Sequence, residues 1–179
     1  MKNTADKSYK CTIAIPVYKR TKFLTKVIQS IVTQQVENIE IIIVDDGSSH
    51  EVWEEVQTFA AKDIKVYRNQ ENRGTFANWN RCLQLSQGKY FKILCSDDFL
   101  EAGSLVKEMN FLESHLSAAF VSSMGITVDV HGNFIGTIAD RLAPGVYKGP
   151  DAIKYLLKFY YNTGINVFNY PSGILFRKD

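Results

Sequence analysis

The sequence predicts a three-layer α/β/α domain built on a mostly parallel β-sheet. Two observations predict this class: short apolar runs alternate with amphipathic helical patterns, and each run ends in a polar loop. Parallel strands need crossover connections of about a dozen residues or more, usually a helix, and such helices cover both faces of the sheet. A third observation, a turn signal between two β-type runs in the second half of the chain, predicts a small antiparallel hairpin beside the sheet.

The first two thirds of the chain carry the alternating units. β-Branched and other apolar residues predict strands over residues 12–17, 39–44, 64–67 and 90–94. Apolar residues at helical spacing predict a helix after each strand, over about 23–32, 52–60, 76–88 and 105–112. Large side chains on these helices are predicted to be core residues rather than site residues: Trp53, Trp79, Met109 and the phenylalanines at helical spacing.

The pattern changes beyond Ala118. Residues 121–129 and 134–138 flank the turn signal His131-Gly132-Asn133 and predict the hairpin. A helix is predicted over about 150–161 and a strand over 174–176. With 179 residues the chain has the size of one domain, so we expect residues 1–179 to form a single unit.

Composition excludes several classes of protein. Hydrophobic residues make up 45% and charged residues 22%, which is typical of globular proteins and not of disordered chains. The net charge of +2 arises from scattered side chains without a basic stripe, so no nucleic-acid partner is expected. The three cysteines form no CxxC pair, which argues against a disulfide framework or a structural zinc site and favours a cytoplasmic setting.

No apolar run reaches the roughly 18–20 residues that span a bilayer, and the polar start of the chain lacks the apolar core of a signal peptide. Membrane association is therefore expected only through regions outside this sequence, which would place the protein in the cytoplasm or at the inner face of the membrane.

Polar side chains cluster where the four predicted strands end. In an open parallel sheet, ligands bind in the crevice outside the carboxyl ends of the strands, so these residues are expected to share one rim. In chain order they are Tyr18, Lys19 and Arg20, then Asp45 and Asp46, then Asn72 and Arg73, then Asp97 and Asp98.

Two acidic pairs on neighbouring loops repel each other unless a divalent cation or the donor groups of a ligand neutralise them. Mg²⁺ takes one or two carboxylates together with phosphate oxygens and water, so Asp97 or Asp98 could hold a metal that bridges a diphosphate. Asp45 or Asp46 could accept hydrogen bonds from a ribose hydroxyl or a base N–H. The simpler alternative is that both acidic segments are turn and helix-capping sequences and that Asn72-Arg73-Gly74 is a surface turn.

In combination, four segments closely resemble the family 2 glycosyltransferases over roughly residues 10 to 115. The segments are Ile13-Ala14-Ile15-Pro16-Val17-Tyr18, Ile43-Val44-Asp45-Asp46-Gly47-Ser48-Ser49, Asn72-Arg73-Gly74 with Asn78, and Ser96-Asp97-Asp98. The resemblance implies a GT-A fold that binds a nucleoside-diphosphate sugar and transfers the sugar with inversion at its anomeric carbon.

The resemblance also implies which residues form the site. Those carried over to nucleotide-sugar binding are Pro16, Val17, Tyr18, Arg20, Asp45, Asp46, Arg73, Asn78 and Asp97. Asp97 and Asp98 correspond to the metal motif of the family, which holds Mn²⁺ or Mg²⁺ on the diphosphate. The acceptor could be a saccharide, a lipid-linked sugar or a protein, and assembly of a cell-surface polysaccharide is the expected setting.

The chain departs from the family pattern in two places. Many members read Asp-x-Asp-Asp at the metal loop, whereas this chain has Cys95 at the first acidic position, which weakens the inference of a metal site. The catalytic base of the family, an Asp or Glu, is expected downstream of a segment like Pro171 to Arg177, and hence beyond Asp179. We therefore expect a chain truncated at its C-terminus that binds donor but transfers sugar poorly or not at all.

Two other classes of protein compete with this interpretation. A phosphoacceptor receiver domain also carries an acidic pair, but after its first strand, whereas Asp45 and Asp46 follow the second predicted strand. A nucleotide-sugar-binding or scaffolding module would keep the fold without catalysis. The absence of GxGxxG and P-loop motifs argues against a dinucleotide oxidoreductase and an NTPase.

Overall fold

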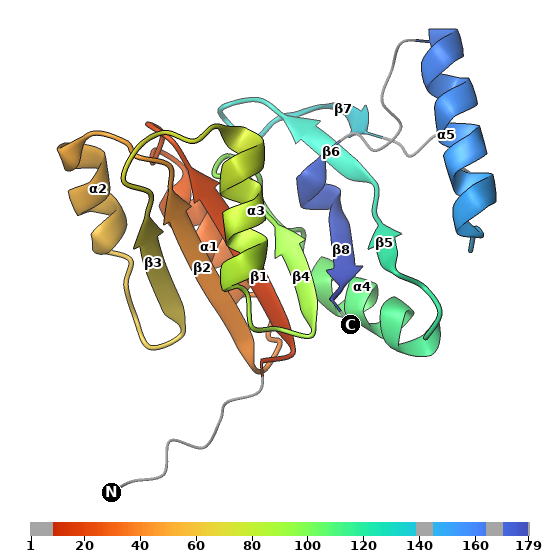
Figure 1. The fold of residues 1–179 in the computed structure, drawn as a ribbon, viewed down its shortest axis with the longest axis horizontal. Helices are drawn as coiled ribbons and strands as arrows, with labels where there is room; N and C mark the ends of the chain where they lie inside the picture. Colours follow the sequence, from red (N-terminus) through yellow and green to blue (C-terminus); the bar gives the residue numbers. More distant parts are fainter. Residues whose placement is uncertain (1–8, 139–144, 164–169, 179) are drawn as a thin grey trace, which may run out of the picture.

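The computed structural model describes residues 9–138, 145–163 and 170–178. A twisted six-stranded sheet forms the body, and a two-stranded hairpin extends from one side of it (Figure 1). The predicted α/β class with a mostly parallel sheet and a small antiparallel hairpin is confirmed.

Four strands of the main sheet are parallel neighbours, in the order β3-β2-β1-β4, and two more continue it as β8-β5. The parallel strands are β1 (Cys11–Val17), β2 (Ile39–Asp45), β3 (Ile64–Arg68) and β4 (Tyr90–Ile93). β8 (Ile174–Arg177) pairs antiparallel with β4, and β5 (Phe120–Ser122) pairs antiparallel with β8. Val17 lies opposite Asp45 in the register of β1 and β2, so the loops that follow these strands start side by side.

Helices cover both faces of the sheet, as predicted, but unequally. The covering helices are α1 (Leu24–Val32), α2 (His50–Gln57), α3 (Thr75–Leu85) and α4 (Ser104–Ser114). A fifth helix, α5 (Gly149–Thr163), lies apart from the sheet, and a short 3₁₀ turn η1 (Pro171–Gly173) precedes β8. The larger core cluster joins one sheet face to α1, α2 and α4, whereas the smaller cluster joins the other face to α3 alone.

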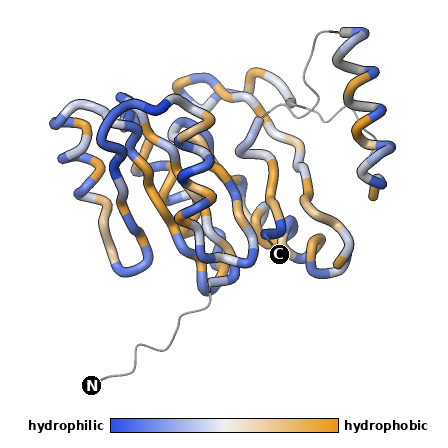
Figure 2. The backbone as a smooth tube through the Cα atoms, in the orientation of Figure 1, coloured by the Kyte–Doolittle hydropathy of each residue, from blue (hydrophilic) through white to orange (hydrophobic). Residues whose placement is uncertain are grey.

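Period-two alternation along the strands builds these two clusters. In β2, Ile41 and Ile43 pack in the larger cluster, while Ile42 and Val44 pack in the smaller one. Both faces of the central strands are buried, which explains why β1 and β2 read as continuous apolar runs (Figure 2).

The structure divides the strand predicted over residues 121–129. Its first part is β5 in the main sheet, and its second part is β6 (Gly125–Val128), which pairs with β7 (Phe134–Ile138) as the predicted hairpin. The division falls at Ser123, whose N–H donates to the carbonyl of Gly173 at 2.8 Å, just before β6 turns toward its own partner.

The helix predicted over 52–60 ends earlier, at Gln57, because the last N–H groups bond three residues back: Phe59 N–H donates to Val56 and Ala60 N–H to Gln57. Met109 is buried, and Trp53 and Trp79 pack against the core as predicted. The prediction was wrong for Phe76, which is 76% exposed and contacts Trp79 edge to face.

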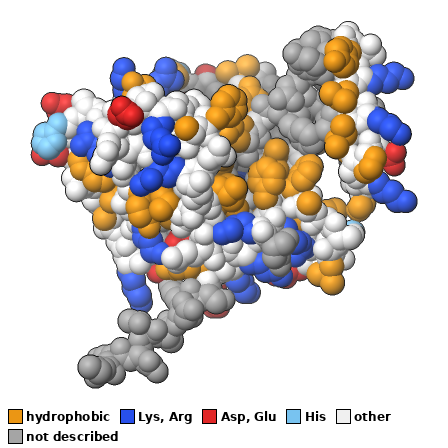
Figure 3. All heavy atoms as spheres, in the orientation of Figure 1, with side chains coloured by type: hydrophobic (Ala, Val, Ile, Leu, Met, Phe, Trp, Pro, Cys, Tyr) orange, Lys and Arg blue, Asp and Glu red, His pale blue; other side chains and the backbone are white. Residues whose placement is uncertain are grey.

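α5 lies away from the main sheet (Figure 1). Ile153, Leu157 and Tyr161 on this helix are exposed, and hydrophobic side chains are visible on its surface (Figure 3). None of the helices in the described part of the chain is long and apolar enough to cross a membrane.

Candidate functional site

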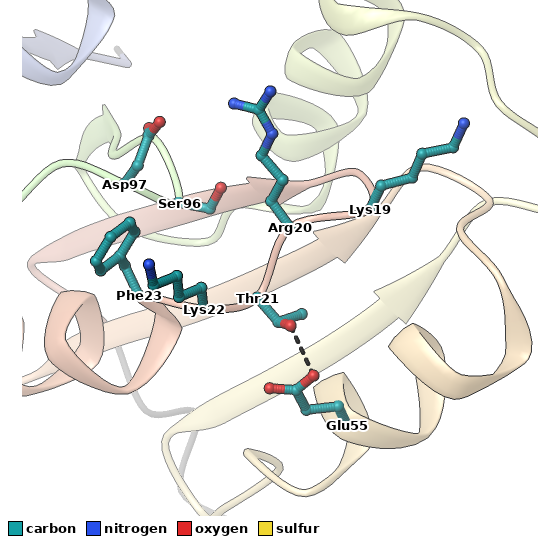
Figure 4. Close-up of a pocket in the computed structure, with 8 residues that line it drawn as sticks. All are labelled: Lys19, Arg20, Thr21, Lys22, Phe23, Glu55, Ser96 and Asp97. Atoms are coloured by element: carbon teal, nitrogen blue, oxygen red, sulfur yellow. Dashed lines mark hydrogen bonds between the residues drawn. The ribbon is translucent and has the colours of Figure 1, made fainter. Parts of the chain in front are cut away.

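A pocket of about 570 Å³ opens between the loop that follows β1 and the loop that follows β4. It lies outside the carboxyl ends of these parallel strands, at the rim expected from the sequence. Lys19, Arg20, Thr21, Lys22, Phe23, Glu55, Ser96 and Asp97 line it, and Figure 4 shows Arg20 and Asp97 extending from the two loops on the same side.

The β1 side of the pocket is cationic. Lys19, Arg20 and Lys22 all line it, whereas Glu55 accepts a hydrogen bond from Thr21 Oγ1 at 2.6 Å. Lys19 has φ +61°, a conformation that costs energy for a residue other than glycine, and its N–H donates to Ser48 Oγ at 2.9 Å. A strained backbone held in place beside a pocket is common at ligand-binding sites, and three basic side chains there favour an anionic ligand such as a phosphate group.

The β4 side of the pocket carries the second acidic pair. Asp97 is exposed, whereas Asp98 is half-buried and accepts a hydrogen bond from Ser172 Oγ at 2.6 Å. Ser172 Oγ also accepts from the N–H of Cys95 at 3.0 Å, so η1 supports this loop from far along the chain. Burial raises the pKa of Asp98 above its usual range, the neighbouring Asp97 charge adds to this, and the Ser172 hydrogen bond opposes it.

Cys95 occupies the position where many family members have the first acid of the metal motif. Burial raises the pKa of its thiol to about 11. Mg²⁺ and Mn²⁺ also prefer oxygen ligands to sulfur, so Cys95 is a poor ligand for either cation. Only Asp97 and Asp98 remain as candidate metal ligands on this loop.

A second pocket of about 330 Å³ lies on the other side of the same loop, and Asp97 lines both pockets. It is bounded by the start of α4, by β6 and by η1. One wall holds Lys92 and Glu108, which form a buried ion pair at 3.0 Å, and Ser123 Oγ donates to the same carboxylate at 2.8 Å.

The acidic pair after β2 has a different environment. Asp45 is fully buried, accepts from the N–H of Ser48, and lies 3.3 Å from Arg68 Nε. Asp46 is 3% exposed, and its carboxylate accepts three hydrogen bonds, from Asn69 Nδ2 at 2.7 Å and from the N–H groups of Arg73 and Gly74 at 3.0 Å each.

Protein groups therefore neutralise the first pair, whereas the sequence had pointed to a divalent cation or to donors from a ligand. In the second pair, Asp98 accepts a hydrogen bond from the Ser172 hydroxyl, and Asp97 is exposed to solvent.

No group of three or more histidine, cysteine or acidic side chains in the described ranges is arranged to hold a metal ion. Mg²⁺ and Mn²⁺ sites on nucleotides do not need such a group, because the cation takes one or two carboxylates and completes its shell with phosphate oxygens and water. The exposed carboxylate of Asp97 and the partly buried one of Asp98 fit a cation of this kind, and the cationic β1 loop across the pocket fits the phosphates that it would bridge.

The structure brings some of the predicted site residues together. Arg20 and Asp97 share the first pocket, and Asp46 contacts the backbone of Arg73, whose side chain is exposed. Asn78 is buried in α3, where its Oδ1 accepts from Asn69 and its Nδ2 donates to the carbonyl of Val44 at 3.1 Å.

Other predicted residues lie at the end of β1. Pro16 is half-buried and Val17 buried within the strand, and Tyr18 is 42% exposed just beyond it. Asp179, the position beyond which the catalytic base is expected, lies outside the described residues.

Several residues at the site escaped the sequence analysis. Lys22 and Glu55 line the first pocket, but lysine and glutamate are common at protein surfaces, so their presence does not indicate a site. Ser172 supports the acidic loop from 74 positions away, and no local pattern could reveal that contact.

Comparison with known proteins identifies the family. The profile of glycosyl transferase family 2 matches residues 12–178. A Haemophilus influenzae protein named as an uncharacterized glycosyltransferase is 35% identical over 126 residues, which cover 69% of this chain and 46% of that protein. Chondroitin synthase of Escherichia coli is 30% identical over 125 residues, which cover 69% of this chain and 18% of the synthase. The chain thus spans less than half the length of these relatives.

Among solved structures, residues 1–349 of TarS from S. aureus, in complex with UDP-GlcNAc, superpose with a TM-score of 0.65 at 22% sequence identity, covering 94% of this chain and 45% of that one. At this identity the likeness shows the fold, which is that of the GT-A glycosyltransferases. The predicted resemblance is confirmed, and the chain belongs to glycosyl transferase family 2.

Proposed function

We propose that this chain binds a nucleoside-diphosphate sugar through a divalent cation and serves an inverting transfer of that sugar to an acceptor hydroxyl. The observation that carries the proposal is the meeting of Asp97 with Lys19, Arg20 and Lys22 in one pocket. A diphosphate with its cation needs both kinds of group, carboxylates for the metal and basic side chains for the phosphate oxygens.

Asp97 and Asp98 would hold Mn²⁺ or Mg²⁺ in this proposal, and the cation would offset negative charge on the leaving diphosphate. Lys19, Arg20 and Lys22 bind phosphate oxygens from the opposite wall. Ser172 keeps the Asp98 carboxylate in place by donating a hydrogen bond to it, and the half-buried Cys95 stays outside the metal shell because these cations prefer oxygen ligands.

The relatives suggest which donor and acceptor to test first. The TarS structure contains UDP-GlcNAc, which supports a uridine diphosphate sugar as donor. The name of chondroitin synthase supports a saccharide acceptor and a role in polysaccharide synthesis. The activity of the whole protein is part of the proposal, because the chain spans less than half of these relatives.

Titration calorimetry with UDP, dTDP and GDP, each with and without Mn²⁺, tests donor binding. We expect UDP to bind in the presence of Mn²⁺ and the other nucleotides to bind more weakly. Failure of the folded chain to bind any of the three would contradict the donor site.

A second assay separates the enzyme from a non-catalytic binding module. UDP release from UDP-GlcNAc is followed in the full-length protein with a saccharide acceptor, and NMR of the product reports the anomeric configuration. Transfer with inversion supports the enzyme, whereas donor binding without acceptor-dependent UDP release would identify a binding module.

A further inference from the structure

Gln34 lies just beyond the end of α1 and reaches the loop that follows β4. Its Nε2 donates hydrogen bonds to the carbonyl of Glu101 and to the carbonyl of Ser30, each at 3.0 Å. Its Oε1 accepts from the N–H of Leu105 at 3.2 Å. The residue is 3% exposed and lines neither pocket. Its polar atoms therefore bind the protein itself and not a ligand.

These three hydrogen bonds need both ends of an amide. The NH₂ end faces two carbonyl groups and the oxygen end faces an N–H group, so no carboxylate or apolar side chain of the same length can replace it. Leu105 is the second residue of α4, and N–H groups in the first turn of a helix have no partner within the helix. Gly103, which precedes the helix, has no side chain to accept from them. Gln34 thus caps α4 from a different element.

Ser30, four residues before Gln34, makes a second contact with the same loop. Its Oγ accepts from the N–H of Leu100 at 3.1 Å. Leu100 follows Asp98 by two positions, so this hydrogen bond holds the backbone next to the acidic pair. Ser172 holds the pair from the other side through the Asp98 carboxylate. The acidic loop is therefore fixed at two places, by η1 and by α1.

α1 also follows directly on the cationic loop of the first pocket. Lys19, Arg20 and Lys22 lie just before the helix and line that pocket. Phe23 at the start of the helix packs edge to face on Phe99, with ring centroids 6.3 Å apart. Buried apolar side chains hold α1 in the larger core cluster. One well-packed helix therefore contacts both loops that face each other across the pocket.

We propose that Gln34, assisted by Ser30, is a positioning residue for the divalent cation. It fixes the loop after β4 on α1, so that Asp97 and Asp98 keep a constant place relative to the cationic loop. This inference rests on the proposed function, because cation binding is part of that function. It gives a task in ligand binding to a buried residue that touches neither the cation nor the nucleotide.

Calorimetric titration of UDP into Gln34→Met, without and with Mn²⁺, tests the inference. Methionine keeps the length of the side chain but cannot replace the three hydrogen bonds. UDP affinity without Mn²⁺ should stay within about twofold of the wild type, whereas the gain in affinity from Mn²⁺ should shrink by about tenfold, the lower end of what lost supporting contacts cost a metal site. An unchanged gain, or equal losses without and with Mn²⁺, would overturn the inference.

Ser30→Ala is a milder variant that keeps the test decisive if Gln34→Met does not fold. It removes only the acceptor of the Leu100 N–H, on a half-buried side chain. The gain from Mn²⁺ should shrink by about threefold, less than in Gln34→Met, because one of the two contacts with the acidic loop remains. A gain equal to that of the wild type would contradict the role of α1 in cation binding.

Thr12→Val is the matched control. Thr12 is also a buried, neutral polar residue, and its Oγ1 accepts from the N–H of Gly88 at 2.8 Å and donates to Glu40 at 2.6 Å. It holds the loop before β4, whereas Gln34 holds the loop after it. Both substitutions should lower thermal stability, but the gain from Mn²⁺ in Thr12→Val should stay within about twofold of the wild type. Similar losses of this gain in both variants would mean that general destabilisation explains the effect, which overturns the inference.

Amide hydrogen exchange without nucleotide or metal provides a readout that does not depend on the proposed function. Gln34→Met should speed exchange at the N–H of Leu105, and Thr12→Val should not. Unchanged exchange at Leu105 would overturn the anchoring role. A wild type whose UDP binding does not respond to Mn²⁺, with exchange altered as expected, would instead contradict the proposed function and the effect of Gln34 on the cation, while the anchoring of the loop would stand.

Discussion

The two acidic pairs of this chain look alike in sequence and differ in almost every physical respect. Asp45 and Asp46 follow β2, are buried, and are neutralised by Arg68, by backbone N–H groups and by Asn69. Asp97 and Asp98 follow β4, and one is exposed while the other accepts a hydrogen bond from Ser172.

This difference shows how a fold assigns two tasks to the same residue type. A carboxylate whose acceptor positions are filled by protein donors stabilises the loops around it, and removing it leaves buried donors unpaired. A carboxylate that faces an open pocket contributes little to stability, but it is available to a ligand or a cation. The following substitutions test whether the two pairs differ in this way.

Asp46→Ala should have the largest effect on stability. It removes the acceptor of three hydrogen bonds and leaves the buried Asn69 amide without that partner. We expect the free energy of unfolding to fall by about 2–4 kcal/mol, measured by urea denaturation. A loss below about 0.5 kcal/mol, the usual range for surface sites, would remove the distinction between the two pairs.

Gly47→Ala should cost about 2 kcal/mol, because it combines an unfavourable positive φ with a clash against the backbone of Glu71 and Asn72. Gly132→Ala in the hairpin is a control with φ +88° and nothing within 4 Å of the added Cβ. Comparison of their melting temperatures separates the backbone strain from the clash. Equal shifts in the two variants would show that the close approach at Gly47 is unimportant.

Ser172→Ala should lower the free energy of unfolding by about 1 kcal/mol, because the hydroxyl bonds both Asp98 and the N–H of Cys95. Loss of the hydrogen bond should also raise the pKa of Asp98 further, since this bond opposes the effect of burial. NMR titration of the Asp98 carboxyl carbon measures the direction. A lower pKa in the variant would mean that the serine does not stabilise the ionised form.

Asp97→Asn should have the smallest effect on stability, within about 0.5 kcal/mol, because the side chain is exposed. Metal-dependent UDP binding should nevertheless fall by tenfold or more in calorimetry. A variant that unfolds at clearly lower urea concentration than the wild type would place Asp97 among the structural residues instead.

The sequence predicted the alternating strands and helices, the hairpin and the common rim, because hydrophobic periodicity and polar strand ends are local signals. It also placed Arg20 and Asp97 at one site. It could not show that the donors for Asp46 come from residues 23 to 28 positions away, because such contacts depend on how the β2 and β3–α3 loops pack.

Two further misses have the same origin. The strand predicted over residues 121–129 divides near Ser123, where the partner strand changes from β8 to β7, and only the folded chain brings β8 near. Phe76 follows the helical spacing of core residues, yet it lies at the start of α3, beyond the buried part of that helix. In each case the local hydrophobic pattern was present, but contacts with other parts of the fold determined where the strand ended or whether the side chain was buried.

The most direct test of the contrast between the two pairs is calorimetric titration of UDP, with and without Mn²⁺, into the wild type and the Asp97→Ala/Asp98→Ala variant. Mn²⁺ should strengthen UDP binding to the wild type and have no effect on UDP binding to the folded variant. Mn²⁺ enhancement that persists in the variant, or that is absent from the wild type, would contradict the assignment of the second acidic pair to the cation.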